Sequence, residues 1–167
     1  MGEFISGRGR SRTCHAYPDS PRFAASAGPF ARNSAAGPGS DVDADPGGTT
    51  ISWLLIESGA TPGTNIPITP QATGTVLMSA VIGLHNVGLS AQDVSVQILV
   101  DAAPLAIPFT ISIPSASFAE LPILTLASAL PIGTTANVTV IVTGSNDVNI
   151  VSTGSYISIY EVAVATG

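Results

Sequence analysis

The sequence predicts an all-β domain, an antiparallel β-sandwich of the jelly-roll type, and three observations indicate it. From residue 49 onward, short runs alternate apolar and polar residues, which is the two-residue period of a strand with one buried face. Gly, Pro, Asn and Asp separate these runs, as expected of turns. No stretch has a helical period, and about eight or nine short strands in roughly 120 residues are typical of a sandwich, jelly roll or barrel.

Each run is bounded by turn residues, so its limits can be stated. In chain order, the expected strands are Thr50–Ser58, Asn65–Thr69, Thr75–Leu84, Val94–Val100, Ile107–Ile113, Phe118–Ala127, Ala136–Thr143, Val148–Val151 and Ser155–Val164. The cleanest alternation is that of the fifth run, where the odd-numbered residues from Ile107 to Ile113 are all apolar and are expected to face one way. Pro122 interrupts the sixth run, which favours an edge strand or a bulge there.

Three of the expected strands are apolar on both faces: Thr50–Ser58, Thr75–Leu84 and Leu121–Ala127. In an antiparallel sandwich only one face of a strand meets the core. A second apolar face needs another cover, and a neighbouring copy in a cyclic oligomer is the simplest one. The pattern therefore predicts a homo-oligomer.

The composition supports the same expectation. Apolar residues make up 45% of the 167 residues and charged residues only 10%, against about 25% charged in an average domain. A chain with so few charges exposes much apolar surface, and large apolar patches usually mark an interface.

The charges are unevenly distributed along the chain. The basic residues are Arg8, Arg10, Arg12, Arg22 and Arg32, and residues 33–167 carry no Lys or Arg, which gives that region a formal charge of −9. Nucleic-acid binding depends on Lys and Arg that neutralise phosphates, so nucleic-acid binding is excluded for the domain. Anionic membranes are disfavoured for the same reason.

The composition also suggests how the chain is divided. Residues 1–40 are rich in Gly, Ser, Ala, Pro and Arg, and the pairs Glu3-Phe4 and Gly39-Ser40 are ones that cloning sites often encode. We therefore expect residues 1–40 to be a flexible leader of cloning origin, with a natural flexible arm as the alternative. Residues 41–48 are expected to be an acidic linker, and 49–167 the jelly-roll domain. Neither a secretory signal core nor a membrane-spanning helix is expected.

A search for chemistry finds no motif of a catalytic, cofactor or metal site. His85 stands at the end of an expected strand without a local catalytic partner, and is interpreted as a strand-end residue. The alternating acids Asp41, Asp43 and Asp45 resemble the start of a calcium loop, but Pro46 follows and the later Gly and Glu are missing. We expect no enzyme, although two carboxylates paired in space stay open as an alternative. The sequon that begins at Asn137 has meaning only in a secretory pathway.

The candidate interaction residues are three large aromatic side chains, Trp53, Tyr156 and Tyr160. Tyr156 and Tyr160 fall on one face of the last expected strand, and Ile157 and Ile159 on the other. The three aromatic residues are candidates for a subunit interface or a ligand platform, for example one that stacks on sugars. The alternative is packing in a core, since aromatic residues bury large areas.

Three segments carry a resemblance to a known family. They are Val94–Asp101 (VSVQILVD), Asn137–Gly144 (NVTVIVTG) and Gly154–Val162 (GSYISIYEV). In texture and strand order, residues 49–164 resemble the C1q/TNF-like jelly-roll domains, nearest to the C-terminal heads of bacterial collagen-like spore-surface (exosporium) glycoproteins. The resemblance implies tight homotrimers with an apolar threefold axis, high stability, and roles as surface heads, adhesins or receptor ligands. The chain departs from the pattern because no Gly-X-Y repeat precedes the domain.

These observations lead to a functional hypothesis. The chain is expected to be a non-enzymatic, self-trimerising head displayed on a spore, cell or virion surface, with itself as a partner and a receptor or glycan as a further one. The alternatives are a phage capsid-decoration or fibre-head protein, a carbohydrate-binding module, and a hydrolase with spatially paired carboxylates.

Overall fold

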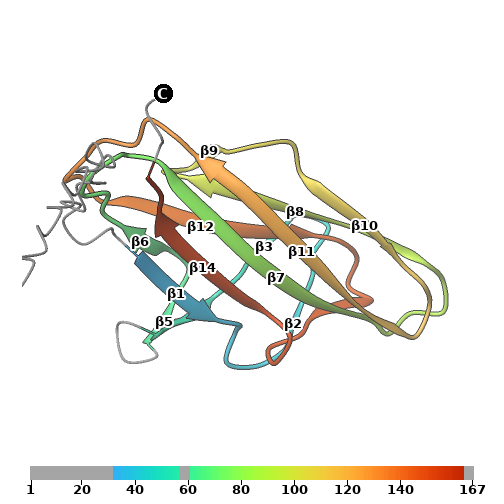
Figure 1. Cartoon of the computed structure of the whole chain (residues 1–167). Helices are drawn as coiled ribbons and strands as arrows, with labels where there is room; N and C mark the ends of the chain where they lie inside the picture. Colours follow the sequence, from blue (N-terminus) through green and yellow to red (C-terminus); the bar gives the residue numbers. More distant parts are fainter. Residues whose placement is uncertain (1–31, 57–60, 164–167) are drawn as a thin grey trace, which may run out of the picture.

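Two antiparallel sheets pack face to face in the computed structural model of the chain (Figure 1). The structure describes residues 32–56 and 61–163. Every strand pairing among these residues is antiparallel. The all-β antiparallel sandwich that the sequence predicts is confirmed.

The first sheet has eight strands and is called the β7 sheet here. Its path runs β2-β13-β7-β14-β1-β4-β5, and β11 pairs with the free side of β7. The strands are β1 (Arg32–Ala36), β2 (Val42–Asp43), β4 (Trp53–Leu55), β5 (Thr61–Gly63), β7 (Val76–Asn86), β11 (Ser117–Ala127), β13 (Val148–Ile150) and β14 (Tyr156–Glu161). Pro122 therefore lies in a strand that pairs on one side only, as its position in the sequence predicts.

The second sheet has six strands and is called the β8 sheet. Its path runs β10-β8-β12-β3, with β6 also pairing β12 and β9 pairing β8. The strands are β3 (Thr49–Thr50), β6 (Ile66–Ile68), β8 (Gln92–Val100), β9 (Ala103–Pro104), β10 (Phe109–Ile113) and β12 (Ala136–Thr143).

The long strands form where the sequence alternates. In β7, the even-numbered residues from Val76 to Leu84 are all buried. The same holds in β8 from Val94 to Val100 and in β12 from Ala136 to Val142. Because successive side chains of a strand point to opposite faces, this alternation directs one apolar face of each sheet towards the other sheet.

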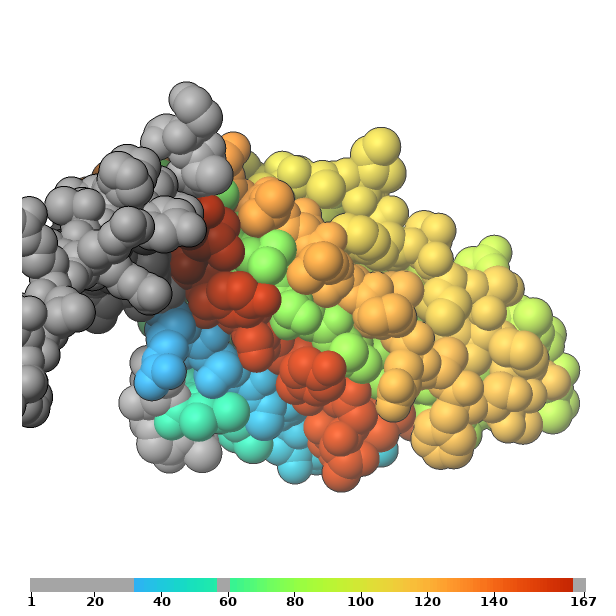
Figure 2. Space-filling model, in the orientation of Figure 1, coloured from blue at the N-terminus to red at the C-terminus, as the bar shows by residue number. Residues whose placement is uncertain are grey.

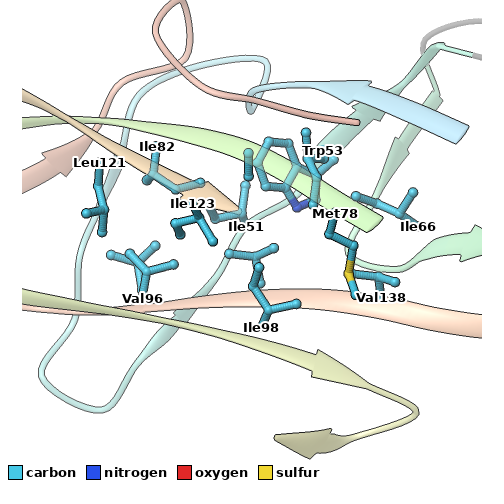
Figure 3. Close-up of a cluster of buried hydrophobic side chains, with 14 of the residues drawn as sticks. Ile51, Trp53, Ile66, Met78, Ile82, Val96, Ile98, Leu121, Ile123 and Val138 are labelled. Carbon is cyan, nitrogen blue, oxygen red and sulfur yellow. The ribbon is translucent and has the colours of Figure 1, made fainter. Parts of the chain in front are cut away.

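The core lies between these two inward faces (Figure 3). Ile82 and Ile123 extend into it from the β7 sheet, and Val96 and Ile98 from the β8 sheet. Trp53 is the largest fully buried side chain in the described part of the chain. The burial of these branched and aromatic side chains is the main favourable contribution to folding.

The predicted start of the domain is wrong. Strand β1 begins at Arg32, pairs with β14 and β4, and buries Ala35 in the core. Strand β2 pairs with β13, and Ala44 beside it is fully buried. Residues 32–48 therefore belong to the sandwich rather than to a leader and an acidic linker. Residues 1–31, where most of the expected leader falls, lie outside the described residues.

The expected strand Thr50–Ser58 is split in two. Its start pairs with β12 in the β8 sheet, whereas Trp53–Leu55 pairs with β1 and β5 in the β7 sheet. Between them the chain crosses the core, and Ile51 is buried there while its amide donates to the Val140 carbonyl at 3.0 Å. The crossing explains how this run buries both Ile51 and Trp53 within one chain, whereas Ile56 at its end stays 57% exposed. Residues 57 and 58 lie outside the described residues.

The expected strand Ile107–Ile113 starts later than predicted. Strand β10 begins at Phe109, opposite Val96, and Ile107 is 87% exposed in the preceding connection. The next part of β8 already pairs with β9 at Leu99 and Val100. Ile98, which the register of β10 would place opposite Ile107, instead accepts a hydrogen bond from the Leu105 amide at 3.0 Å, so Ile107 stays outside the sheet.

Among residues 32–56 and 61–163, no helix is long and apolar enough to cross a membrane.

Candidate functional site

The candidate site is an apolar surface on the outer side of the β7 sheet, called the apolar face here. It consists of the outward side chains of Leu77, Val81, Leu124, Leu126, Tyr156 and Tyr160. Figure 2 shows this side of the molecule, where β11, β7, β14 and β1 run side by side.

Strand register brings these side chains together in rows. Leu126 lies opposite Leu77 on the neighbouring strand, and Leu77 lies opposite Tyr160 on the next. In a second row, Pro122 lies opposite Val81 and Val81 opposite Tyr156. Directly opposite side chains on one face of an antiparallel pair lie within contact distance, so each row is an apolar strip. Between the two strips, Leu124 lies opposite Ser79 and Ser79 opposite Ser158, so hydroxyl groups separate the strips on β7 and β14.

The outer members of the face are uncovered within the described chain. Leu124 is 66% exposed, Leu126 55%, Tyr156 50% and Tyr160 40%. Single exposed apolar residues are normal on a protein surface, but contiguous apolar patches usually mark an interaction site. The uncovered second face that the sequence predicts for β7 and β11 is therefore present.

The outer side of the β8 sheet has the opposite character. Thr110 lies opposite Ser95, and Ser95 lies opposite Thr143, so that a row of hydroxyl groups crosses β10, β8 and β12. Gln97 and Asn137 also face outward on this side, with the half-buried Leu99 and Ile141 among them. The two sheets thus share one core but present very different surfaces to their surroundings.

The structure separates the three aromatic candidates. Tyr156 and Tyr160 point outward on the apolar face, while Ile157 and Ile159 between and beside them are buried, in the orientation that the alternation predicts. Trp53 is 0% exposed, so its assignment to a subunit interface or ligand platform is wrong. Its side chain fills the core because residues 51–55 cross between the sheets, and its Nε1 has no hydrogen-bond partner in the described structure.

His85 lies at the end of the same outer side, as a half-buried residue near the end of β7. Its ring stacks on that of Phe118, with centroids 3.8 Å apart and planes 7° from parallel. Phe118 and His85 are directly opposite each other in the register. The contact is a packing contact between two rings and places no nucleophile against the imidazole.

The acids at 41–45 serve the local backbone. The amide and the hydroxyl of Ser152 both donate to Asp41 Oδ1, at 2.8 and 2.9 Å. These two hydrogen bonds lower the pKa of Asp41, with the amide as the largest cause and a smaller favourable contribution from His85. Asp45 Oδ1 accepts a hydrogen bond from the Gly47 amide at 2.8 Å. Within the described ranges, no three acidic, His or Cys side chains gather to hold a metal ion.

Two buried polar residues that the sequence did not single out stabilise the loops around the sheet. Asn86 is fully buried, and its Nδ2 lies within hydrogen-bonding distance of the carbonyls of Ser90, Ile113 and Pro114. Its Oδ1 accepts a hydrogen bond from the Gly88 amide at 2.9 Å. The side chain thereby joins the β7–β8 loop to the β10–β11 loop.

Glu161 is the second of these residues and holds the opposite end of the sheet. Its carboxylate accepts hydrogen bonds from four consecutive backbone amides, those of residues 71–74, at 2.5–3.1 Å. A signal for it exists in the sequence, since the alternation that buries Ile157 and Ile159 also directs Glu161 inward. A charged residue at an inward position indicates a dedicated set of partners.

Structural comparison identifies the fold. The solved structure of murine APRIL at pH 5.0 is similar to this chain with a TM-score of 0.52 and 12% sequence identity, over 80% of this chain and 100% of that one. The chain has a TNF-like jelly-roll fold. This similarity establishes the TNF-like architecture alone, because the identity is low.

Two further solved structures are similar to a lower degree. Eiger TNF from S. frugiperda has a TM-score of 0.46 and 16% identity, over 83% of this chain and 96% of that one. An exo-β-1,3-galactanase from Phanerochaete chrysosporium, bound to β-1,3-galactotriose, has a TM-score of 0.31 and 13% identity, over 74% of this chain and 27% of that one. No family model and no curated protein matches the sequence.

Proposed function

We propose that this chain is a non-enzymatic surface module that assembles with copies of itself through the apolar face. The observation that carries the proposal is the contrast between the two outer sides of one TNF-like sandwich. The β7 sheet exposes Leu124, Leu126 and two tyrosines, whereas the β8 sheet exposes Thr, Ser, Gln and Asn.

Burial of the apolar face by a second copy is favourable for a simple reason. Removal of apolar surface from water contributes about 25 cal/mol for each Å² buried. Among the residues that the structure describes, no Lys or Arg lies on this face except Arg32 at its margin, so these residues bring little positive charge to be desolvated. Because each copy presents the same face, a closed cyclic assembly leaves no apolar face open to solvent.

The proposed number of copies in the assembly and its biological setting are inferred from the resemblance to C1q/TNF-like domains in residue pattern and strand order. C1q/TNF-like domains imply a homotrimer, and their nearest relatives in texture imply display on a spore, cell or virion surface, with a receptor as a further partner. A phage capsid-decoration or fibre-head protein would use the same assembly in a different setting. A non-enzymatic role is supported by the stacking of the His85 ring on Phe118 and by the two hydrogen bonds that Asp41 accepts from Ser152.

The proposal is tested with one charge placed on either side of the sandwich. Leu126→Asp introduces a carboxylate into the apolar face, and Thr110→Asp introduces the same group into the polar outer side. Both positions are exposed and both lie on strands that pair on one side within their sheets. We expect size-exclusion chromatography with light scattering to show an oligomer for the wild type and for Thr110→Asp, and a single chain for Leu126→Asp.

Two results contradict the proposal. One is a wild-type chain that stays monomeric at micromolar concentration. The other is dissociation by Thr110→Asp while Leu126→Asp stays assembled, which places the interface on the wrong sheet. Circular dichroism of each variant shows whether the fold is retained.

A further inference from the structure

A small pocket lies on the outer side of the β7 sheet, next to the row of Pro122, Val81 and Tyr156 at one end of the apolar face. Its volume is about 320 Å³, and its lining includes Gly83 of β7, Phe118 and Glu120 of β11, and Thr153 and Gly154 of the turn after β13. In Figure 2 it lies between the orange strand β11 and the red-orange turn that follows β13. Gly83 is roughly 20 Å along β7 from Leu77, at the usual rise per residue.

The floor of the pocket is formed by two glycines in close contact. A Cβ added to Gly83 would lie 3.0 Å from the Gly154 Cα and carbonyl carbon. Hydrogen bonds hold this floor from both sides: the Gly83 amide donates to the Ser155 hydroxyl at 3.0 Å, and its carbonyl accepts from the Val151 amide at 2.8 Å. The Ser155 hydroxyl donates in turn to the Val151 carbonyl at 2.8 Å. The shape of the pocket is therefore set before any ligand enters.

The walls combine one aromatic ring with two exposed oxygen-bearing groups. Phe118 is 70% exposed, and its ring is kept in place by the stacking contact with His85. Glu120 and Thr153 are exposed at the rim, and neither side chain has a hydrogen-bond partner in the part of the chain that the structure describes. Binding pockets are typically lined by apolar and aromatic groups with a few polar groups that fix orientation.

We propose that this pocket binds a neutral pyranose. One face of a pyranose ring presents C–H groups, which suit an aromatic ring, and its edge presents hydroxyls, which suit a carboxylate and a hydroxyl. A rigid aromatic side chain provides contact area at a low cost in conformational entropy.

The charges favour a neutral sugar over an acidic one. Glu120 places a negative charge at the rim. The only Lys or Arg among the described residues is Arg32, which pairs with Tyr160 at the far end of the sheet. Among the described residues, no Lys or Arg is therefore near enough to offset the repulsion of a uronate or sialate carboxylate.

The pocket and the proposed assembly can fail separately, although Val81 and Tyr156 of the apolar face are near Gly83 and Gly154 along their strands. Leu126 and Tyr160 lie at the other end of the sheet, so a chain that fails to assemble still has the pocket, and a chain that fails to bind a sugar can still assemble.

The test is a titration of the isotope-labelled full chain, followed by the amide resonances of Gly83, Glu120 and Gly154. The probes are methyl glycosides of glucose, galactose, mannose and N-acetylglucosamine, with methyl glucuronide as the acidic counterpart, each at millimolar concentration. We expect at least one neutral glycoside to shift these three resonances, and the glucuronide to leave them unchanged. Absence of any shift with all neutral probes, or an equal response to the glucuronide, overturns the proposal.

Variants then locate the binding. Phe118→Ala is expected to weaken binding about tenfold, the size of a lost aromatic contact. Gly154→Ala adds a methyl group to the floor at 3.4 Å from Gly83 Cα, an ordinary contact, and is expected to weaken binding by steric exclusion. Thr110→Ala, on the polar outer side of the other sheet and outside both the pocket and the apolar face, is the control and is expected to bind as the wild type does. Binding that survives both pocket variants overturns the proposal, as does equal loss in the control.

Discussion

The outer sides of the two sheets are built from the same strand geometry and differ in what they leave uncovered. On the β7 sheet, β11 directs Leu124 and Leu126 away from the core, at 66% and 55% exposure. On the β8 sheet, β10 directs Thr110 and Ser112 away from the same core. Burial of one face is sufficient to form each strand, so the residues of the second face are not constrained by core packing and can serve an interaction instead. In this TNF-like sandwich one second face is suited to water and the other to a partner.

The largest expected difference in stability is between substitutions on the two faces of one strand, β14. Ile159→Ala removes a fully buried side chain and is expected to lower the free energy of unfolding by about 2–5 kcal/mol, the cost of a cavity in a packed core. Tyr160→Ala, the next residue, is expected to cost less than about 1 kcal/mol in a single chain and to weaken assembly instead. Urea unfolding on the Leu126→Asp background measures both as single chains. If both variants lost the same free energy of unfolding, Tyr160 would be part of the core, and the two faces of β14 would not differ as proposed.

A second comparison uses two glutamates of the β7 sheet, one facing in and one facing out. Glu161→Gln replaces a carboxylate that accepts four backbone amides and is expected to cost about 1.5–3 kcal/mol, because hydrogen bonds to charged groups are the stronger ones. Glu120→Gln on the outer side is expected to stay within about 0.5 kcal/mol of the wild type. Thermal unfolding of the two variants side by side measures the difference. If Glu161→Gln is neutral, the carboxylate is not what holds residues 71–74.

The salt response sharpens the comparison between apolar and polar surfaces. An apolar interface strengthens in sodium sulfate, which raises the cost of exposed apolar area, and is insensitive to the screening that sodium chloride provides. We expect sulfate to shift the oligomer to lower protein concentration in sedimentation velocity, with little change in sodium chloride. Dissociation by sodium chloride would instead indicate an interface held by charges.

The smallest effect concerns a contact on neither face. Asp41 has a lowered pKa because the Ser152 amide and hydroxyl donate to it. A lowered folded pKa contributes stability that is present above the unfolded value, about 3.9 for aspartate, and is lost as the pH falls through the folded pKa. Ser152→Ala removes the hydroxyl but keeps the amide, so the pKa of Asp41, followed by carboxyl NMR, is expected to rise only part of the way. An unchanged pKa in that variant would show that the hydroxyl contributes nothing.

The long strands could be predicted from the sequence because local alternation alone determines them. β12 begins and ends where the run Ala136–Thr143 does, and the two faces of β14 are those that Tyr156, Ile157 and Ile159 indicate. The turn after Thr143 and the edge position of Pro122 follow from residue chemistry in the same way.

The features that could not be predicted from the sequence depend on contacts between distant segments of the chain. Strand β1 buries only Ala35 strongly, so RNSAA shows no alternation, and it is a strand because β14 and β4 flank it. The sequence alone leaves Trp53 between a platform, an interface and the core, and only the crossing between the sheets places it in the core. Asn86 contacts residues 27 and 28 positions away, and no local pattern reports such partners. The pocket at Gly83 likewise joins two strands and a turn that are far apart in the sequence.

The central claim is that copies of the chain cover the apolar face of the β7 sheet. Multi-angle light scattering of the full chain at micromolar concentration measures this directly. The account predicts a mass three times that of the 16.8 kDa chain. A mass of one chain, with Leu124 and Leu126 in water, would contradict it.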